Sequence, residues 1–200
     1  CLALLRQNPK IARHFLGIST AARAEPFAIA IRSLQREMIV RDPHWRDGAY
    51  TDEDWPETGM RLARKLGMIS YRSGEEWRER FGRSQEVHFS ERLFGMHFSV
   101  ESYLEYAAKK FIHNFDPCCY LFLSQSIDWF DLSDGYADMR DAFADLKIES
   151  AKVIGVVIMD YAVNLYLIIL GYKHNGVAPI ISKGMSGARL ERFVDPLPQA

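Results

Sequence analysis

The chain has 200 residues and a mass of 23.0 kDa, and 48% of its residues are hydrophobic, so it can bury a sizeable core. This composition excludes a disordered or low-complexity protein. The 25 Lys and Arg residues nearly balance 26 Asp and Glu residues, giving a net charge of -1, and the two signs are interleaved, which argues against nucleic-acid binding.

The cysteines do not form a recognisable framework. The chain has three cysteines, an odd number: Cys1, Cys118 and Cys119. None of them has the CxxC or Cys/His spacing of a zinc site. The pattern predicts no disulfide framework and no metal, and it fits a reducing, cytoplasmic compartment. The chain begins inside an amphipathic helical pattern without a signal-peptide pattern, so we expect a piece of a longer protein.

The first part of the chain alternates helices with a strand. Helical spacing at residues 2–9 is followed by the short apolar run 11–18, which predicts a strand. A long helix is expected from about Glu25 until Asp42-Pro43 ends it. Residues 44–56 predict a loop, and helical spacing resumes over 59–66.

The middle of the chain predicts a second loop and then further helices. Residues 72–91 are rich in Arg, Glu, Gly and Ser and have little periodicity, so we expect a mobile loop there. Apolar faces at helical spacing return over 100–112 and 120–129. A set of aromatic residues predicts core packing or a dimer contact: Trp45, Tyr50, Trp55, Trp129 and Phe130.

The C-terminal part predicts a strand, a helix and a strand, over 152–159, 165–172 and 178–182. With the N-terminal strand, these elements predict an α/β fold with a parallel sheet, and the helical block between them predicts a cap over the strand ends. Residues after Ile18 and after Met159 should then face one crevice.

The apolar segment 153–172 is nearly long enough to span a bilayer. Asp160 and Asn164 interrupt it near its middle, and a buried carboxylate is costly in hydrocarbon. Its first half is β-branched and its second half has helical spacing, so we expect a buried strand and a buried helix rather than a membrane segment.

Four segments together resemble a known enzyme family. They are DPHWRDGAY (42–50), GMRLARKLGMISYRS (59–73), FSVESYLEYAAKKF (98–111) and FDPCCYLFLSQSIDWFDL (115–132). In this order they resemble the homoserine O-acyltransferases, over about residues 1–156. The resemblance implies a partial α/β-hydrolase fold with a large inserted helical cap, with 1–24 and 146–200 in the hydrolase core and 25–145 in the cap.

The resemblance also implies a chemistry. Members of the family move an acetyl or succinyl group from acyl-CoA to the hydroxyl of homoserine, or of serine in some members, through a covalent acyl-serine. A serine on a nucleophile elbow, an aspartate and a histidine form the triad. Acyl-CoA is a co-substrate, so no cofactor is expected. The resemblance further implies small-molecule partners and a homodimer formed through the cap.

The triad serine and aspartate are poorly matched in this sequence. The match of residues 4–9 to the family helix after the elbow places the serine, and the oxyanion hole with it, before Cys1. Aligned through 153–156, the family's aspartate falls on Met159, so Asp160 stands one residue late. Asp160 can serve only if a bulge or the strand end restores its direction, and a helix N-cap is the alternative.

The histidine base is not matched either. Where the family has Gly-His-Asp, this chain has Gly187, Ala188 and Arg189. His174 is the last histidine, and its place in a Lys-His-Asn-Gly turn favours a solvated residue at a helix C-terminus. The chain is therefore not expected to be a competent acyltransferase by itself.

The cap carries the best-matched substrate residues. In the family, the arginine and tyrosine of the pattern ARxxxxxxYRS help to hold the amino-acid substrate, and the matching residues here are Arg64 and Tyr71. A guanidinium offers a bidentate fork to an α-carboxylate, and a phenol orients a nearby polar group. The alternative for Arg64 is a surface ion pair with a carboxylate such as Glu57. Arg36 is interpreted as a structural ion-pair partner.

Two functional hypotheses remain open. The first is the C-terminal part of a homoserine or serine O-acyltransferase, whose activity belongs to the complete protein. The second is a non-catalytic family member kept for dimerisation or as a structural protein, which the missing Gly-His-Asp favours. An ordinary serine hydrolase is disfavoured because the cap segments match acyltransferases and because a hydrolase needs the same missing serine.

Overall fold

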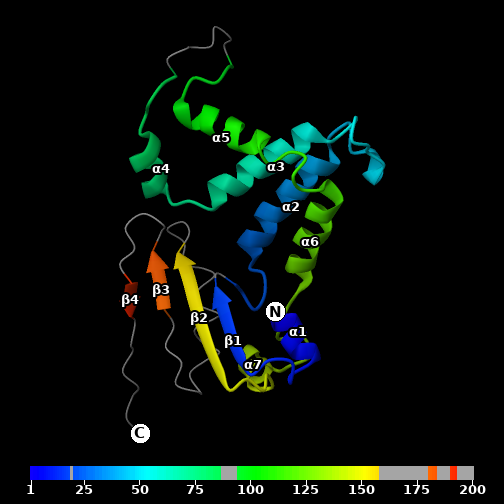
Figure 1. The fold of residues 1–200 in the computed structure, drawn as a ribbon, viewed down its shortest axis with the longest axis vertical. Helices are drawn as coiled ribbons and strands as arrows, with labels where there is room; N and C mark the ends of the chain where they lie inside the picture. The colour runs from blue at the N-terminus through cyan, green and yellow to red at the C-terminus, as the bar shows by residue number, and fades with distance from the viewer. Residues whose placement is uncertain (19, 87–93, 158–179, 184–189, 193–200) are drawn as a thin grey trace. The chain divides into compact units, whose positions relative to one another are not determined.

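The computed structural model describes residues 1–18, 20–86, 94–157, 180–183 and 190–192, with side chains up to Lys152. The chain forms two compact units, one of residues 1–25 and 128–200 and the other of residues 26–127. The first unit holds the sheet, and the second holds most of the helices (Figure 1).

The sheet of the first unit has four strands in the order β1-β2-β3-β4 (Figure 1). The strands are β1 (His14–Ile18), β2 (Ser150–Val157), β3 (Ile180–Lys183) and β4 (Leu190–Arg192). β1, β2 and β3 run parallel, which confirms the predicted parallel sheet. β4 pairs antiparallel with β3, a pairing that the sequence does not predict. β1 stands at an edge of this sheet, and its Leu16 and Ile18 are exposed.

Two short helices pack in the same unit, α1 (Leu2–Gln7) and α7 (Met139–Ala144). They share one hydrophobic core with the side chain of Phe15 from β1, and its buried members include Leu2, Leu5, Leu132 and Phe143. Residues 128–145 belong to this first unit, whereas the resemblance places them in the cap. The roles of the two units as hydrolase core and cap stay a prediction.

The second unit is built from helices. They are α2 (Pro26–Val40), the short 3-10 helix η1 (Arg46–Gly48), α3 (Glu57–Ser70), α4 (Gly74–Phe81), α5 (Ser99–Lys109) and α6 (Pro117–Trp129), which runs to the unit boundary. α2 packs on α3, and α3 packs on α5. The buried residues Ile39, Met60 and Ala63 form its core, as expected from the apolar spacing of α2 and α3.

The contact between α2 and α3 depends on a glycine. A Cβ atom at Gly59 would lie 2.5 Å from the carbonyl oxygen of Met38 and 2.8 Å from the Cα of Ile39. The backbone N–H of Gly59 also donates to the buried carboxylate of Asp42, at 2.7 Å. Because the backbones of the two helices are in direct contact here, the start of α3 is fixed against the end of α2.

Helix α4 shows that the prediction of an irregular loop over 72–91 was wrong for its first part. Ser73 caps this helix, because its Oγ accepts from the N–H of Glu76 at 3.1 Å. Acidic residues fill the first turn, and Arg78 and Arg80 lie in the last turn, as the helix dipole favours. Capping and end charges stabilise this polar helix, so a search for apolar spacing does not find it.

Candidate functional site

Arg64 and Tyr71 lie on one face of α3. They are seven residues apart, which is close to two full helical turns, so both side chains project to the same side. Tyr71 directly follows the helix, and its N–H donates to the carbonyl oxygen of Gly67 at 3.1 Å. Its hydroxyl would lie 3.6 Å from a Cβ atom at Gly67, so the phenol leans back along α3 toward Arg64.

The guanidinium of Arg64 lacks a described counter-charge. Its Nε is buried and has no hydrogen-bond partner among the described residues. Its Cζ lies 4.6 Å from the centroid of the Phe111 ring. Within the described part of the chain it forms no ion pair with Glu57 or another carboxylate, so the expected alternative of a surface ion pair is not what the structure shows.

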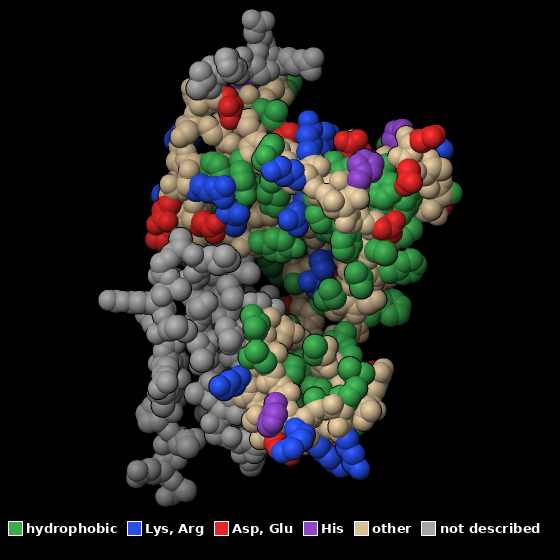
Figure 2. Space-filling view, in the orientation of Figure 1, with side chains coloured by type: hydrophobic (Ala, Val, Ile, Leu, Met, Phe, Trp, Pro, Cys, Tyr) green, Lys and Arg blue, Asp and Glu red, His purple; other side chains and the backbone are tan. Residues whose placement is uncertain are grey.

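Arg72 of this unit also contacts aromatic rings, but it has an anionic partner as well. Arg72 lies 5.5 Å from the Trp77 ring, yet it also pairs with Glu76 and donates to the hydroxyl of Tyr103 at 3.0 Å. Figure 2 shows Lys and Arg side chains among hydrophobic ones on the visible face of the unit. Arg64 therefore differs from Arg72 by combining a buried donor with a charge that no described carboxylate compensates.

Gln35 of α2 faces the same part of α3. Its side chain is 4% exposed, and its Nε2 donates to the carbonyl oxygen of Ala63 at 2.9 Å. The same Nε2 would lie 2.8 Å from a Cβ atom at Gly67, so only glycine leaves room for it. A polar residue in the apolar spacing of α2 is the signal that could have identified Gln35 from the sequence.

Tyr120 of α6 completes the group, which we call the Arg64 cluster: Gln35, Arg64, Tyr71, Phe111 and Tyr120. Burial and the nearby Tyr71 phenol raise the pKa of Tyr120 to about 12, against the opposing effects of Arg64, Gln35 and Arg32. The Tyr120 hydroxyl is therefore a neutral hydrogen-bond donor near neutral pH. The sequence does not mark Tyr120 as a site residue, because it looks like one more apolar residue of α6.

Arg36 has a structural contact outside this cluster. One of its guanidinium nitrogens donates to the Oγ of Ser124 at 2.7 Å, and Ser124 is buried. The bond joins α2 to α6, and its acceptor is a hydroxyl rather than a carboxylate, so the role of Arg36 as an ion-pair partner stays a prediction. The bond also fixes the helix that carries Tyr120 relative to the helix that carries Gln35.

The residues proposed for the catalytic triad lie outside the described residues. Asp160, Met159, His174, Ala188 and Arg189 all fall in segments that the structure does not describe. Their roles therefore stay predictions. The helices that are described include none long and apolar enough to cross a membrane, and most of the apolar segment 153–172 is not described. Among the described side chains, no group of three His, Cys, Asp or Glu could hold a metal ion.

Curated relatives share a large part of this sequence. The serine O-succinyltransferase of Xylella fastidiosa (strain M12) is 51% identical over 158 residues, which cover 77% of this chain and 42% of that protein. The serine O-succinyltransferase of Xanthomonas campestris pv. campestris (strain B100) is 56% identical over 168 residues, which cover 77% of this chain and 44% of that protein. The chain thus spans less than half the length of these relatives.

Solved structures show the same fold. A homoserine O-acetyltransferase from Bacillus anthracis matches 90% of this chain, and 48% of its own chain is covered, with a TM-score of 0.74 at 16% identity. Esterase E22 matches 92% of this chain, and 51% of its own chain is covered, with a TM-score of 0.73 at 16% identity. Both have the α/β-hydrolase fold, which confirms the predicted fold class. No protein-family model matches the chain.

Proposed function

Because this chain belongs to the homoserine and serine O-acyltransferase family, we propose that the protein transfers an acyl group from acyl-CoA to the hydroxyl of serine or homoserine. The observation that carries the proposal is the guanidinium of Arg64, whose buried Nε has no hydrogen-bond partner among the described residues, on the same helix face as Tyr71. The names of the curated relatives favour serine as the acceptor and a succinyl group as the acyl group.

In the proposed mechanism the acyl group moves twice. The Oγ of a serine attacks the thioester carbonyl, a covalent acyl-serine forms, and CoA leaves as the thiol. The acceptor hydroxyl then attacks the acyl-serine ester while a histidine takes its proton, and the serine Oγ regains a proton. These 200 residues contain no Gly-x-Ser-x-Gly elbow, so the serine of this mechanism would come from residues outside them.

Within this chain, the proposed roles are binding and orientation. The Arg64 guanidinium holds the α-carboxylate of the acceptor through two parallel hydrogen bonds, and the Tyr71 hydroxyl orients the bound amino acid. A buried Nε strengthens such a pair, because a charge-assisted bond gains strength where water is excluded. Asp160 is proposed to orient the histidine base.

We also propose a cytoplasmic homodimer that forms through α6. This helix carries one charged residue, Asp128, along its 13 residues. Phe122, Leu123 and Ile127 are 70%, 55% and 55% exposed, and their spacing places them on one stripe of the helix. An apolar stripe on an almost uncharged helix supports contact with a second copy of the chain.

A second candidate function is a non-catalytic family member that dimerises or serves as a structural protein. The observation that favours it is Ala188, which stands where the family has its histidine base. Such a protein would retain the Arg64 cluster without catalysing acyl transfer.

The test is carried out on the complete protein that contains this chain. CoA thiol release from succinyl-CoA and acetyl-CoA is measured with L-serine or L-homoserine as the acceptor, and calorimetry measures amino-acid binding separately. We expect Arg64→Ala to raise the KM for the amino acid by at least roughly 10- to 100-fold, since that is the size of one hydrogen bond to a charged group and two are lost.

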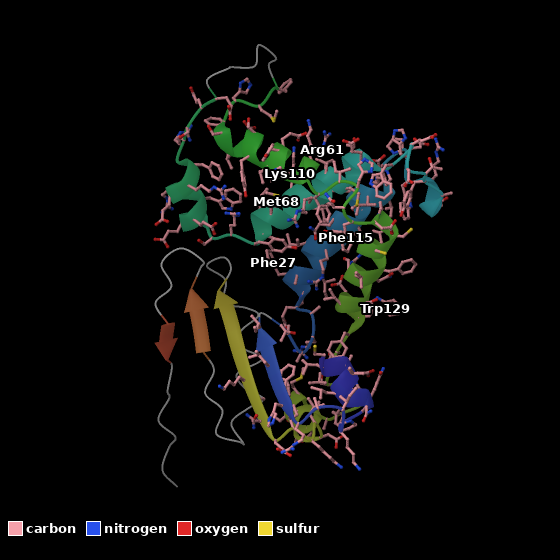
Figure 3. All side chains as sticks on the ribbon, viewed as in Figure 1. Phe27, Arg61, Met68, Lys110, Phe115 and Trp129 are labelled. Carbon is pink, nitrogen blue, oxygen red and sulfur yellow. The ribbon has the colours of Figure 1, made fainter. Side chains whose placement is uncertain are left out.

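Arg61→Ala is the matched control, because Arg61 lies on the same helix (Figure 3) and pairs with Glu105. An unchanged KM in Arg64→Ala would refute the assignment of Arg64. Amino-acid binding without CoA release would favour the non-catalytic alternative.

A further inference from the structure

Tyr120 is held by a set of aromatic contacts. Its ring lies edge-on to Phe111 and Phe115, with centroids 6.5 Å and 6.2 Å apart and interplanar angles of 80° and 88°. Phe115, labelled in Figure 3, precedes α6 and also stacks on Phe111 at 5.7 Å. The ring packs against the core of Ile39, Met60 and Ala63. These contacts fix the direction in which the Tyr120 hydroxyl points.

The Tyr120 ring meets the rest of the Arg64 cluster at Phe111, and the Gln35 amide and the Tyr71 hydroxyl both lie beside Gly67, 2.8 Å and 3.6 Å from where its Cβ atom would be. Burial and Tyr71 raise the pKa of the Tyr120 hydroxyl, whereas Arg64 and Gln35 lower it. These groups come from α2, from α3 and from the residue after α3, whereas Tyr120 comes from α6. Phe111 contacts both Arg64 and Tyr120. The guanidinium of Arg64 lies over the Phe111 ring, and the Tyr120 ring packs edge-on against the same ring. Three segments far apart in the sequence thus contribute polar groups to one cluster.

A bound α-carboxylate needs more donors than Arg64 supplies. A carboxylate has about four lone-pair sites, and a bidentate guanidinium occupies two of them. A buried carboxylate with unfilled acceptor sites is costly, so a further donor beside it stabilises the bound amino acid. A tyrosine that keeps its proton at neutral pH can supply that bond without adding a negative charge.

We propose that the Tyr120 hydroxyl is an additional donor to the α-carboxylate of the acceptor, and that it makes the site selective for acceptors that carry a carboxylate. This inference rests on the proposed function, because it assigns a further residue to the same amino-acid site. Gln35 positions this hydroxyl from α2, where its amide is fixed by the bond to Ala63. Ethanolamine, which has the amine and the hydroxyl of serine but no carboxylate, gains nothing from Tyr120.

The test uses Tyr120→Phe in the complete protein, because phenylalanine keeps the ring and its packing. We expect the Kd of L-serine to rise roughly 10- to 100-fold by calorimetry, as for one hydrogen bond to a charged group. The kcat should change little once serine is saturating, and the weak binding of ethanolamine should not change. Tyr106→Phe is the control, because Tyr106 is 61% exposed on α5.

Each result decides a separate question. An unchanged Kd for serine in Tyr120→Phe, or an equal weakening of serine and ethanolamine, would overturn the role of Tyr120. Wild-type protein that binds serine but releases no CoA would refute the transferase activity, and the Kd of Tyr120→Phe would still decide the inference. Wild-type protein that binds neither serine nor homoserine would overturn both proposals.

Discussion

Replacing Gly59 with alanine tests how closely α2 and α3 approach each other. The added Cβ atom would lie 2.5 Å from the carbonyl oxygen of Met38, 2.8 Å from the Cα of Ile39 and 3.1 Å from the Cβ of Asp42. Two of these three atoms belong to the backbone of α2, so they cannot rotate away as a flexible side chain can. We therefore expect Gly59→Ala to separate the two helices and to strain the bond from Gly59 to Asp42.

The magnitude follows from two opposing effects. Alanine gains at most about 1 kcal/mol over glycine from helix propensity, and less near the start of a helix. An extra methyl group in a packed core costs about 1–3 kcal/mol, and backbone contacts under 3 Å place this site at the upper end. We expect a net loss of about 2 kcal/mol in the free energy of unfolding, which lowers the Tm by about 4–8 °C in a protein of this size.

The assay is urea unfolding followed by tryptophan fluorescence, since Trp45, Trp55 and Trp77 all lie in the second unit. Gly74→Ala is the matched control, because a Cβ atom at Gly74 meets nothing within 4 Å. That variant should be unchanged, or more stable by about 0.4–1 kcal/mol. If Gly59→Ala unfolds at the same urea concentration as Gly74→Ala, the close approach of α2 and α3 is refuted.

Three further predictions concern the second unit. Burial raises the pKa of Glu105, but Lys65, Arg61 and Lys109 outweigh this effect and hold the pKa below its ordinary value. Glu105 therefore stabilises the fold above the pKa that it has in the unfolded chain, and this contribution is lost as the pH falls through the folded pKa. Thermal melts at acidic pH should show a smaller acid-induced loss of stability in Glu105→Gln than in wild type. Gln35→Leu should lower the free energy of unfolding by about 1 kcal/mol, because the bond to the Ala63 carbonyl is lost, and calorimetry should show weaker serine binding; unchanged binding would contradict the positioning role of Gln35. Phe122→Glu should convert a dimer into a monomer in analytical ultracentrifugation, and a dimer that persists would place the interface elsewhere.

The sequence predicts the elements that have an apolar stripe or a continuous apolar run. α2, α3, α5 and α6 follow from helical spacing, and the parallel arrangement of β1, β2 and β3 follows from the order of strands and helices. α4 is missed because its stability comes from the Ser73 cap and the charges at its ends. α7 has six residues, too few for a periodic pattern to stand out.

The candidate site is predicted in part. Arg64 and Tyr71 come from the family pattern, and the structure places them on one helix face. Gln35 and Tyr120 are not predicted, because their contribution depends on which helix faces become neighbours. Apolar spacing shows which side of a helix is buried, but it does not show which polar groups of other helices lie against that side.

The position of β1 has a consequence for how the isolated chain behaves. Leu16 and Ile18 are 57% and 58% exposed, and within the described sheet β1 has a neighbour on one side only. Open backbone N–H and C=O groups beside uncovered apolar side chains form a template on which a strand of another molecule can add. We expect a preparation of these 200 residues alone to associate edge to edge as its concentration rises, and a polypeptide segment that covers this edge to suppress aggregation.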